Sequence, residues 1–137
     1  MVQLIMGLSG SGKTKTLVSL VKETVALEHG DVVCIEKNKA LTYDIPYKAR
    51  LIHVSAYGIN TNTLLKGFLS GLHTGNYDIT HVFIDEFYKI LDDRSDAAVE
   101  EFLNWLNDFG ERERVNFTII ASADPGKVSD GIKRYFA

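Results

Sequence analysis

The sequence has little cysteine and no long apolar run, and each shortage excludes a class of protein. Cys34 is the only cysteine among the 137 residues, so one chain can build neither a disulfide framework nor a cysteine zinc site. This favours a reducing compartment, and we expect a cytoplasmic location, in the host cytoplasm if the protein is viral. No apolar run approaches the roughly 20 residues needed to cross a bilayer, so we expect no membrane partner.

The sequence also lacks a strong excess of charge of either sign. It has 15 Lys+Arg against 18 Asp+Glu, a formal net charge of −3, and 45% of its residues are hydrophobic. This balance argues against a protein that coats nucleic acid, because such a protein needs a basic face to displace counterions, but it is compatible with a local basic edge. The hydrophobic content is typical of a globular protein, and we expect one domain over residues 1–137.

Short apolar runs alternate with longer segments of helical period, a pattern typical of a parallel sheet joined by crossover helices. We therefore expect an α/β fold with a mostly parallel sheet of about five strands and helices on both faces. The predicted strands are Val2–Met6, Asp31–Glu36, Ala49–Ser55, His81–Asp85 and Phe117–Ser122. The predicted helices are Lys13–Glu28, the stripe Leu64–Leu72 that ends at Gly75, and the stripe Val99–Leu106 that ends at Gly110.

One motif indicates a phosphate site. Residues Gly7–Thr14, here called the P-loop, match G-x-x-x-x-G-K-[ST] between a predicted strand and a predicted helix. We expect its glycines to adopt backbone conformations closed to other residues, so that successive N–H groups cradle an anion. Lys13 brings positive charge to the β- and γ-phosphates as a catalytic group, and the Thr14 hydroxyl is a ligand for Mg²⁺. The residues predicted to bind the nucleotide are Gly7, Ser9, Gly10, Ser11, Gly12, Lys13, Thr14 and Lys15.

Two carboxylates follow the apolar run Val82–Ile84, at the sheet edge where ligands bind in open α/β folds. Asp85 is the expected second metal residue, which holds Mg²⁺ against the phosphates together with Thr14. Glu86 is the expected catalytic base that orients or deprotonates the attacking nucleophile. We call Asp85 and Glu86 the acidic pair.

The P-loop and the acidic pair together resemble P-loop NTPases with an additional catalytic glutamate, a group that includes RecA-like ATPases, helicases, packaging motors and AAA+ proteins. The resemblance implies a RecA-like strand order, in which Phe117–Ala121 lies between the P-loop strand and the strand before Asp85. It also implies a γ-phosphate sensor at the tip of that strand, either Ser122, our catalytic candidate, or Asp124. The implied activity is Mg²⁺-dependent hydrolysis of ATP or another NTP, coupled to work on nucleic acid or to assembly.

Motor-type ATPases usually add an arginine from a neighbouring subunit. The residues that this resemblance offers for that role are Arg94, Arg112, Arg114 and Arg134. A basic and aromatic C-terminal end also suits a phosphate backbone, although a solvated helix face explains it as well. That end consists of Lys127, Lys133, Arg134 and Tyr135.

Two other functions stay open. The run Asp85-Glu86-Phe87 and the element order are similar to thymidine kinases of the zinc-bearing type, which implies a nucleoside kinase. Those kinases have a lid stapled by cysteines, however, whereas this chain has only Cys34, and their phosphate loop is bulkier. The third function is a nucleotide-dependent binding module with little turnover.

The expected strand order leaves one edge of the P-loop strand unpaired. An exposed apolar edge at Val2–Met6 invites association, so we expect a cover. Residues Ile132–Ala137 fold back on it, or a second copy of the chain covers it as a homo-oligomer, or the natural protein continues. The polar segment 37–48 is interpreted as a surface excursion, and the rings of Tyr43, Tyr47 and Tyr57 in or near it as packing residues.

Overall fold

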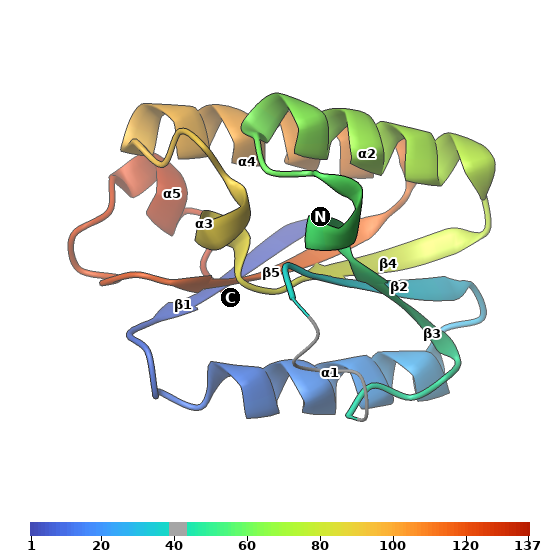
Figure 1. Ribbon diagram of the computed structural model, residues 1–137. Helices are drawn as coiled ribbons and strands as arrows, with labels where there is room; N and C mark the ends of the chain where they lie inside the picture. The colour runs from blue at the N-terminus through green and yellow to red at the C-terminus, as the bar shows by residue number, and fades with distance from the viewer. Residues whose placement is uncertain (39–43) are drawn as a thin grey trace.

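The computed structural model describes residues 1–38 and 44–137, whose strands form a five-stranded sheet with helices on both faces (Figure 1). The strand order is β1-β5-β4-β2-β3, and every pair is parallel. The strands are β1 (Val2–Gly7), β2 (Asp31–Glu36), β3 (Ala49–His53), β4 (Ile79–Ile84) and β5 (Asn116–Ser122). The prediction of an α/β fold is confirmed, and β5 lies between β1 and β4 as the resemblance implied.

Three long helices make the outer layers. They are α1 (Lys13–Leu27), α2 (Asn62–Gly75) and α4 (Asp96–Glu113). Helix α1 lies on one face of the sheet, while α2 and α4 cover the other (Figure 1). The short helices are η1 (Val54–Tyr57), α3 (Phe87–Ile90) and α5 (Asp130–Lys133). Strand β3 ends at His53, two residues before its predicted end at Ser55, because the 3₁₀ turn η1 begins at Val54.

The unbroken apolar strands are explained by burial on both faces of the sheet. On β4, the side chains of Val82 and Ile84 belong to the core beneath α2 and α4, whereas Phe83 belongs to the core beneath α1. Alternation along a strand sends successive side chains to opposite faces, so both faces need apolar residues. The C-terminal tip of β4 is therefore held firmly where the acidic pair begins.

Helix α4 extends beyond its predicted end. It continues through Gly110 to Glu113, and Arg114 ends it with a left-handed φ of 59° and an N–H bond to the Gly110 carbonyl. A Cβ at Gly110 would lie 2.6 Å from the Val115 carbonyl oxygen. The glycine thus allows the chain to pass closely beneath the helix on its way into β5, and reading it as a helix stop was wrong.

The C-terminal segment covers part of the free edge of β1. The Leu4 N–H donates to the Tyr135 carbonyl at 2.7 Å, and the Ala137 N–H donates to the Leu4 carbonyl at 3.2 Å. Leu4 and Phe136 form a parallel bridge, and Ile132 is fully buried. The prediction that Ile132–Ala137 folds back on this edge is confirmed.

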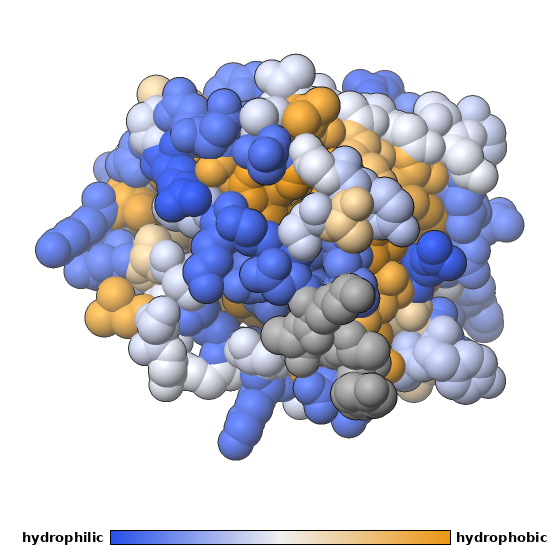
Figure 2. Space-filling model, viewed as in Figure 1, coloured by the Kyte–Doolittle hydropathy of each residue, from blue (hydrophilic) through white to orange (hydrophobic). Residues whose placement is uncertain are grey.

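The surface carries exposed apolar residues among hydrophilic ones (Figure 2). Tyr47 is 92% exposed and Tyr57 is 69% exposed, so the interpretation of these rings as packing residues was wrong; Tyr43 lies outside the described residues. Within residues 1–38 and 44–137, no helix has both the length and the apolar character that a membrane span requires.

Candidate functional site

The P-loop connects the end of β1 to the start of α1. Gly10 and Gly12 have φ angles of 82° and 84°, in the left-handed region that glycine adopts without strain. Gly7 is not among the left-handed glycines, and a Cβ there would lie 2.8 Å from the Ser11 Oγ. The prediction that all three glycines adopt conformations closed to other residues is therefore wrong for Gly7, where an added Cβ would only force the Ser11 side chain to move.

The Lys13 ammonium lies against the loop itself. Its Nζ donates to the Leu8 carbonyl at 2.8 Å and to the Ser11 Oγ at 3.3 Å. In the described part of the chain, no side chain caps the first turn of α1. The N–H groups of that turn and the positive end of the helix dipole can thus receive an anion beside Lys13.

Asp85 is fixed at the tip of β4 and is 7% exposed. Its N–H donates to the Ile35 carbonyl at 2.8 Å, and its Oδ1 accepts from the Glu86 N–H at 2.9 Å. Burial raises the pKa of the Asp85 carboxyl; the Glu86 N–H and the charges of Lys13 and Lys89 oppose that rise. The part of Asp85 that reaches the surface lines the same cavity as Thr14, so its carboxylate can offer an oxygen ligand there.

Glu86 has a left-handed backbone, with φ 54° and ψ 40°, at the start of α3. This conformation costs a non-glycine residue about 1–3 kcal/mol, and such strain is common at functional sites. The Glu86 Oε2 lies 3.1 Å from the Lys89 Nζ. The turn places the glutamate carboxylate beside the P-loop instead of continuing the line of the strand.

These elements enclose a cavity of about 540 Å³, here called the site cavity. It is lined by Ser9, Gly10, Gly12, Lys13, Thr14, Lys15, Asp85, Glu86, Lys89, Ile120 and Ser122. The predicted site residues therefore meet at one place, except that Gly7 and Ser11 do not line it. Ser122 is paired with Gly7 across β5 and β1. Asp124, the other sensor candidate, instead accepts a hydrogen bond from the Gly126 N–H at 2.9 Å.

Sequence reasoning missed Lys89 and Ile120 as lining residues. Lys89 carried a usable signal, because it stands three residues after Glu86, a spacing that brings side chains together on a helical turn. Ile120 lies two residues before the predicted sensor and reads only as a core residue of β5. Its presence shows that β5 contributes to the wall of the site cavity.

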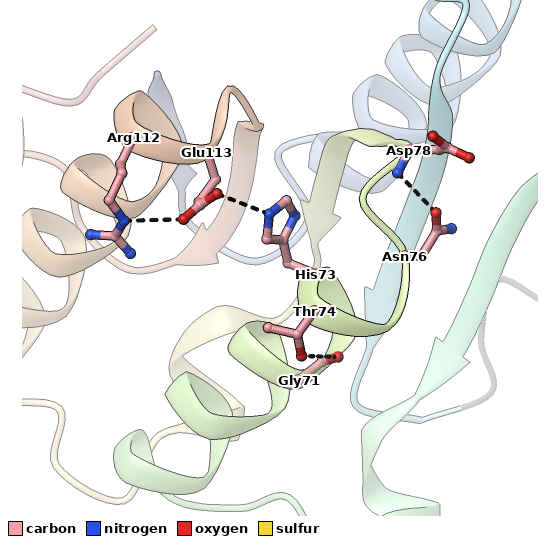
Figure 3. Close-up of polar contacts among 7 residues, drawn as sticks. All are labelled: Gly71, His73, Thr74, Asn76, Asp78, Arg112 and Glu113. Carbon is pink, nitrogen blue, oxygen red and sulfur yellow. Dashed lines mark hydrogen bonds and ion pairs between the residues drawn. The ribbon is translucent and has the colours of Figure 1, made fainter.

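Within the described chain, none of the four candidate arginines lines the site cavity. Arg94 donates to the Leu91 carbonyl at 3.2 Å, and Arg134 donates to the Tyr135 hydroxyl at 2.8 Å. Arg112 bonds Glu113 at 3.1 Å (Figure 3), and Arg114 follows it at the end of α4. Since β5 begins at Asn116 and reaches the cavity at Ser122, these two lie at the opposite edge of the sheet from the cavity of their own chain.

The donor set fits a lightly coordinated magnesium ion. The described residues contain no group of three or more histidine, cysteine or acidic side chains able to hold a metal by themselves. Figure 3 shows His73 of α2 pointing instead to Glu113 of α4, with 3.2 Å between the Nε2 and the Oε2. Thr14 and Asp85 both line the site cavity and offer oxygen ligands. Mg²⁺ commonly takes one or two protein oxygens and completes its shell with phosphate and water, so these residues suit it.

Comparison with known proteins places the chain in a family. A search of curated proteins gives no match. The model of one family, "ATPase family associated with various cellular activities (AAA)", matches residues 3–136, which include both the P-loop and the acidic pair. This agrees with the P-loop NTPase resemblance at the level of the family, and it indicates nucleotide binding and ATP hydrolysis in general. The chain belongs to the ATPase family associated with various cellular activities, AAA.

Proposed function

We propose that the protein binds Mg·ATP in the site cavity and hydrolyses it, and that the hydrolysis is coupled to assembly or to work on nucleic acid. The observation that carries the proposal is the meeting of the P-loop, the acidic pair and Ser122 around one cavity of about 540 Å³. A phosphate-binding loop alone supports binding only. A carboxylate beside that loop, able to accept a proton from water, supports turnover as well.

Binding begins with the P-loop and α1. The N–H groups of the loop and of the first turn of α1 receive the phosphate oxygens. Lys13 exchanges its neutral acceptors, the Leu8 carbonyl and the Ser11 Oγ, for phosphate oxygens. The exchange is favourable because hydrogen bonds between two charged groups are shorter and stronger than bonds to neutral oxygens.

The Thr14 hydroxyl and the Asp85 carboxylate are the residues that would hold Mg²⁺. The Asp85 Oδ1 accepts a hydrogen bond from the Glu86 N–H, and this bond fixes the orientation of the carboxylate. When bound, Mg²⁺ neutralises charge on the β- and γ-phosphate oxygens. The burial that opposes the charge of Asp85 also makes its attraction for a cation stronger than it would be in water.

Glu86 acts as the base. Its carboxylate accepts a proton from the attacking water while the water oxygen forms a bond to the terminal phosphorus. The bond from that phosphorus to the bridging oxygen of ADP breaks, and ADP and phosphate leave. The Ser122 hydroxyl donates a hydrogen bond to the terminal phosphate, whose charge rises in the transition state.

Phosphate release tests the proposal. Purified protein is assayed with Mg²⁺ and each NTP, alone and with nucleosides or with single- or double-stranded DNA. We expect phosphate release from ATP without any acceptor, and stimulation by DNA if the coupled work is on nucleic acid. ADP production that requires a nucleoside would indicate the kinase instead, and tight binding with negligible turnover would indicate the binding module.

Glu86→Gln separates binding from catalysis. The amide keeps the shape of the side chain but cannot take the proton, so we expect turnover to fall by about 10²–10⁴-fold while ATP stays bound. Rapid filtration with labelled ATP measures the trapped nucleotide. Glu23→Gln, an exposed position on α1, is the matched control and should behave as the unsubstituted protein. Unchanged turnover in Glu86→Gln would remove Glu86 from its role.

A further inference from the structure

A third ammonium group lines the site cavity, on the side of the acidic pair. Lys13 and Lys15 come from the P-loop and α1, whereas Lys89 comes from α3, directly after the acidic pair. The P-loop motif accounts for Lys13, and Lys15 follows the motif in the first turn of α1. Neither that motif nor the acidic pair accounts for Lys89.

The backbone of Lys89 is held firmly at the sheet edge. Its N–H donates to the Glu86 carbonyl at 2.9 Å, and its carbonyl accepts from the Lys37 Nζ, beyond the end of β2, at 3.0 Å. The neighbouring Phe87 and Ile90 are buried and anchor the turn in the core. The position from which the Lys89 side chain reaches into the cavity is therefore fixed.

The side chain of Lys89, in contrast, is free to exchange partners. This side chain is 60% exposed, and within the described part of the chain the Lys89 ammonium bonds only the Glu86 Oε2, at 3.1 Å. The Glu86 side chain is 23% exposed, so water reaches the pair mainly from the lysine side; a single ion pair open to water in this way contributes little stability. A phosphate oxygen, which carries more negative charge, can therefore displace the Glu86 carboxylate from the Lys89 ammonium with little loss of free energy.

The contact with Glu86 indicates which phosphate Lys89 would meet. In the proposed reaction, the attacking water lies between the Glu86 carboxylate and the terminal phosphorus. A cation within hydrogen-bonding distance of that carboxylate is then adjacent to the oxygens of the terminal phosphate and farther from the inner phosphates. Lys13, by contrast, bonds the P-loop.

We propose that Lys89 breaks its contact with Glu86 and binds the terminal phosphate of the nucleotide. This exchange of partners lets the site distinguish a triphosphate from a diphosphate. The inference rests on the proposed function and deepens it. It gives the terminal phosphate a second cation from this chain besides Lys13, in a cavity that none of the described arginines lines. Release of the Glu86 carboxylate would also make it available for the attacking water.

The test compares two affinities. Titration calorimetry with Mg²⁺ measures the Kd of AMP-PNP, a triphosphate analogue that is not hydrolysed, and the Kd of ADP. We expect Lys89→Met to weaken AMP-PNP about tenfold or more, since a charged hydrogen bond is lost, and to change ADP by less than about twofold. Lys89→Arg keeps a cation at the same place and should keep the preference for AMP-PNP. Lys22→Met, at an exposed position on α1, should change neither affinity.

The ratio of the two affinities decides between the outcomes, because a merely structural role for Lys89 would weaken both nucleotides together. An unchanged ratio in Lys89→Met, with both nucleotides bound by the unsubstituted protein, would overturn this inference and leave the proposed function standing. Failure of the unsubstituted protein to bind either nucleotide would overturn both. If thermal melting shows that Lys89→Met is unfolded, the same ratio is measured on Lys89→Gln and judged by the same criterion.

Discussion

Asp85 and Glu86 are each held in an arrangement that lowers the stability of the folded protein. Burial opposes the charge of Asp85, and the left-handed backbone of Glu86 costs about 1–3 kcal/mol. The surrounding contacts maintain both states: the Asp85 N–H is bonded to the Ile35 carbonyl, and the next residue, Phe87, is fully buried. A firm strand tip that carries strained polar residues is the arrangement expected where a protein binds charge.

His81 is the residue for which we predict a pH effect on stability. Burial lowers its pKa from 6.5, although Glu28 opposes the shift. As pH falls below 6.5, the unfolded chain gains a proton that the folded chain resists, so the free energy of unfolding decreases. His81→Gln removes the titration while keeping polar atoms near Glu28 and Thr118, both of which bond the ring. We expect this variant to lose less stability than the unsubstituted protein across that range.

Denaturant titration at a series of pH values measures this difference. His29→Gln, at an exposed position, is the control and should follow the unsubstituted protein. Parallel losses of stability in all three proteins would contradict the assignment to His81. Because the side chain is stacked on Phe83, with 4.3 Å between the ring centroids, circular dichroism should accompany each titration to show that the sheet is intact.

Among the secondary-structure elements, the strands were the most predictable part of the fold. Short apolar runs located all five, and the runs in the central strands β4 and β5 are the most continuous because those strands are covered on both faces. The end of α4 was not predictable, because the same glycine suits a helix stop and a close approach of two backbones. Only the fold reveals that the Val115 carbonyl occupies the space a side chain at Gly110 would need.

Gly110→Ala tests this explanation. Alanine normally stabilises a helix interior relative to glycine by about 0.5–1 kcal/mol. Here the new Cβ would meet the Val115 carbonyl oxygen at 2.6 Å, so we expect a loss of about 1–3 kcal/mol from the displaced backbone. Gly67→Ala in α2 is the matched control, because nothing lies within 4 Å of its Cβ, and it should stabilise the protein. Equal effects of the two substitutions on chemical denaturation would contradict the explanation.

At the scale of the whole molecule, the sequence predicted which motifs meet at the site cavity, but not all of the residues that line the cavity. The P-loop and the acidic pair converge because parallel strands present their carboxyl ends at one edge, a consequence of topology that motif spacing anticipates. The position of β5 between β1 and β4 came from the family resemblance, since apolar runs carry no order. Lys89 was missed because its spacing of three residues from Glu86 places the two side chains together but does not tell whether they face the site cavity or solvent.

The C-terminal segment links the fold to the association state. Removing residues 135–137 takes away the two bonds to Leu4 and the buried Tyr135 side chain, which leaves the edge of β1 unpaired. Unpaired apolar edges recruit other strands, so we expect the shortened chain to unfold more easily and to show a mass that rises with concentration in light scattering. Tyr135→Phe is the control: it loses the hydroxyl bonded to Asn104 but retains the backbone cover. It should keep the same mass as the unsubstituted chain at each concentration. A shortened chain that also matches the unsubstituted mass throughout would mean that the segment stabilises the core without protecting the edge.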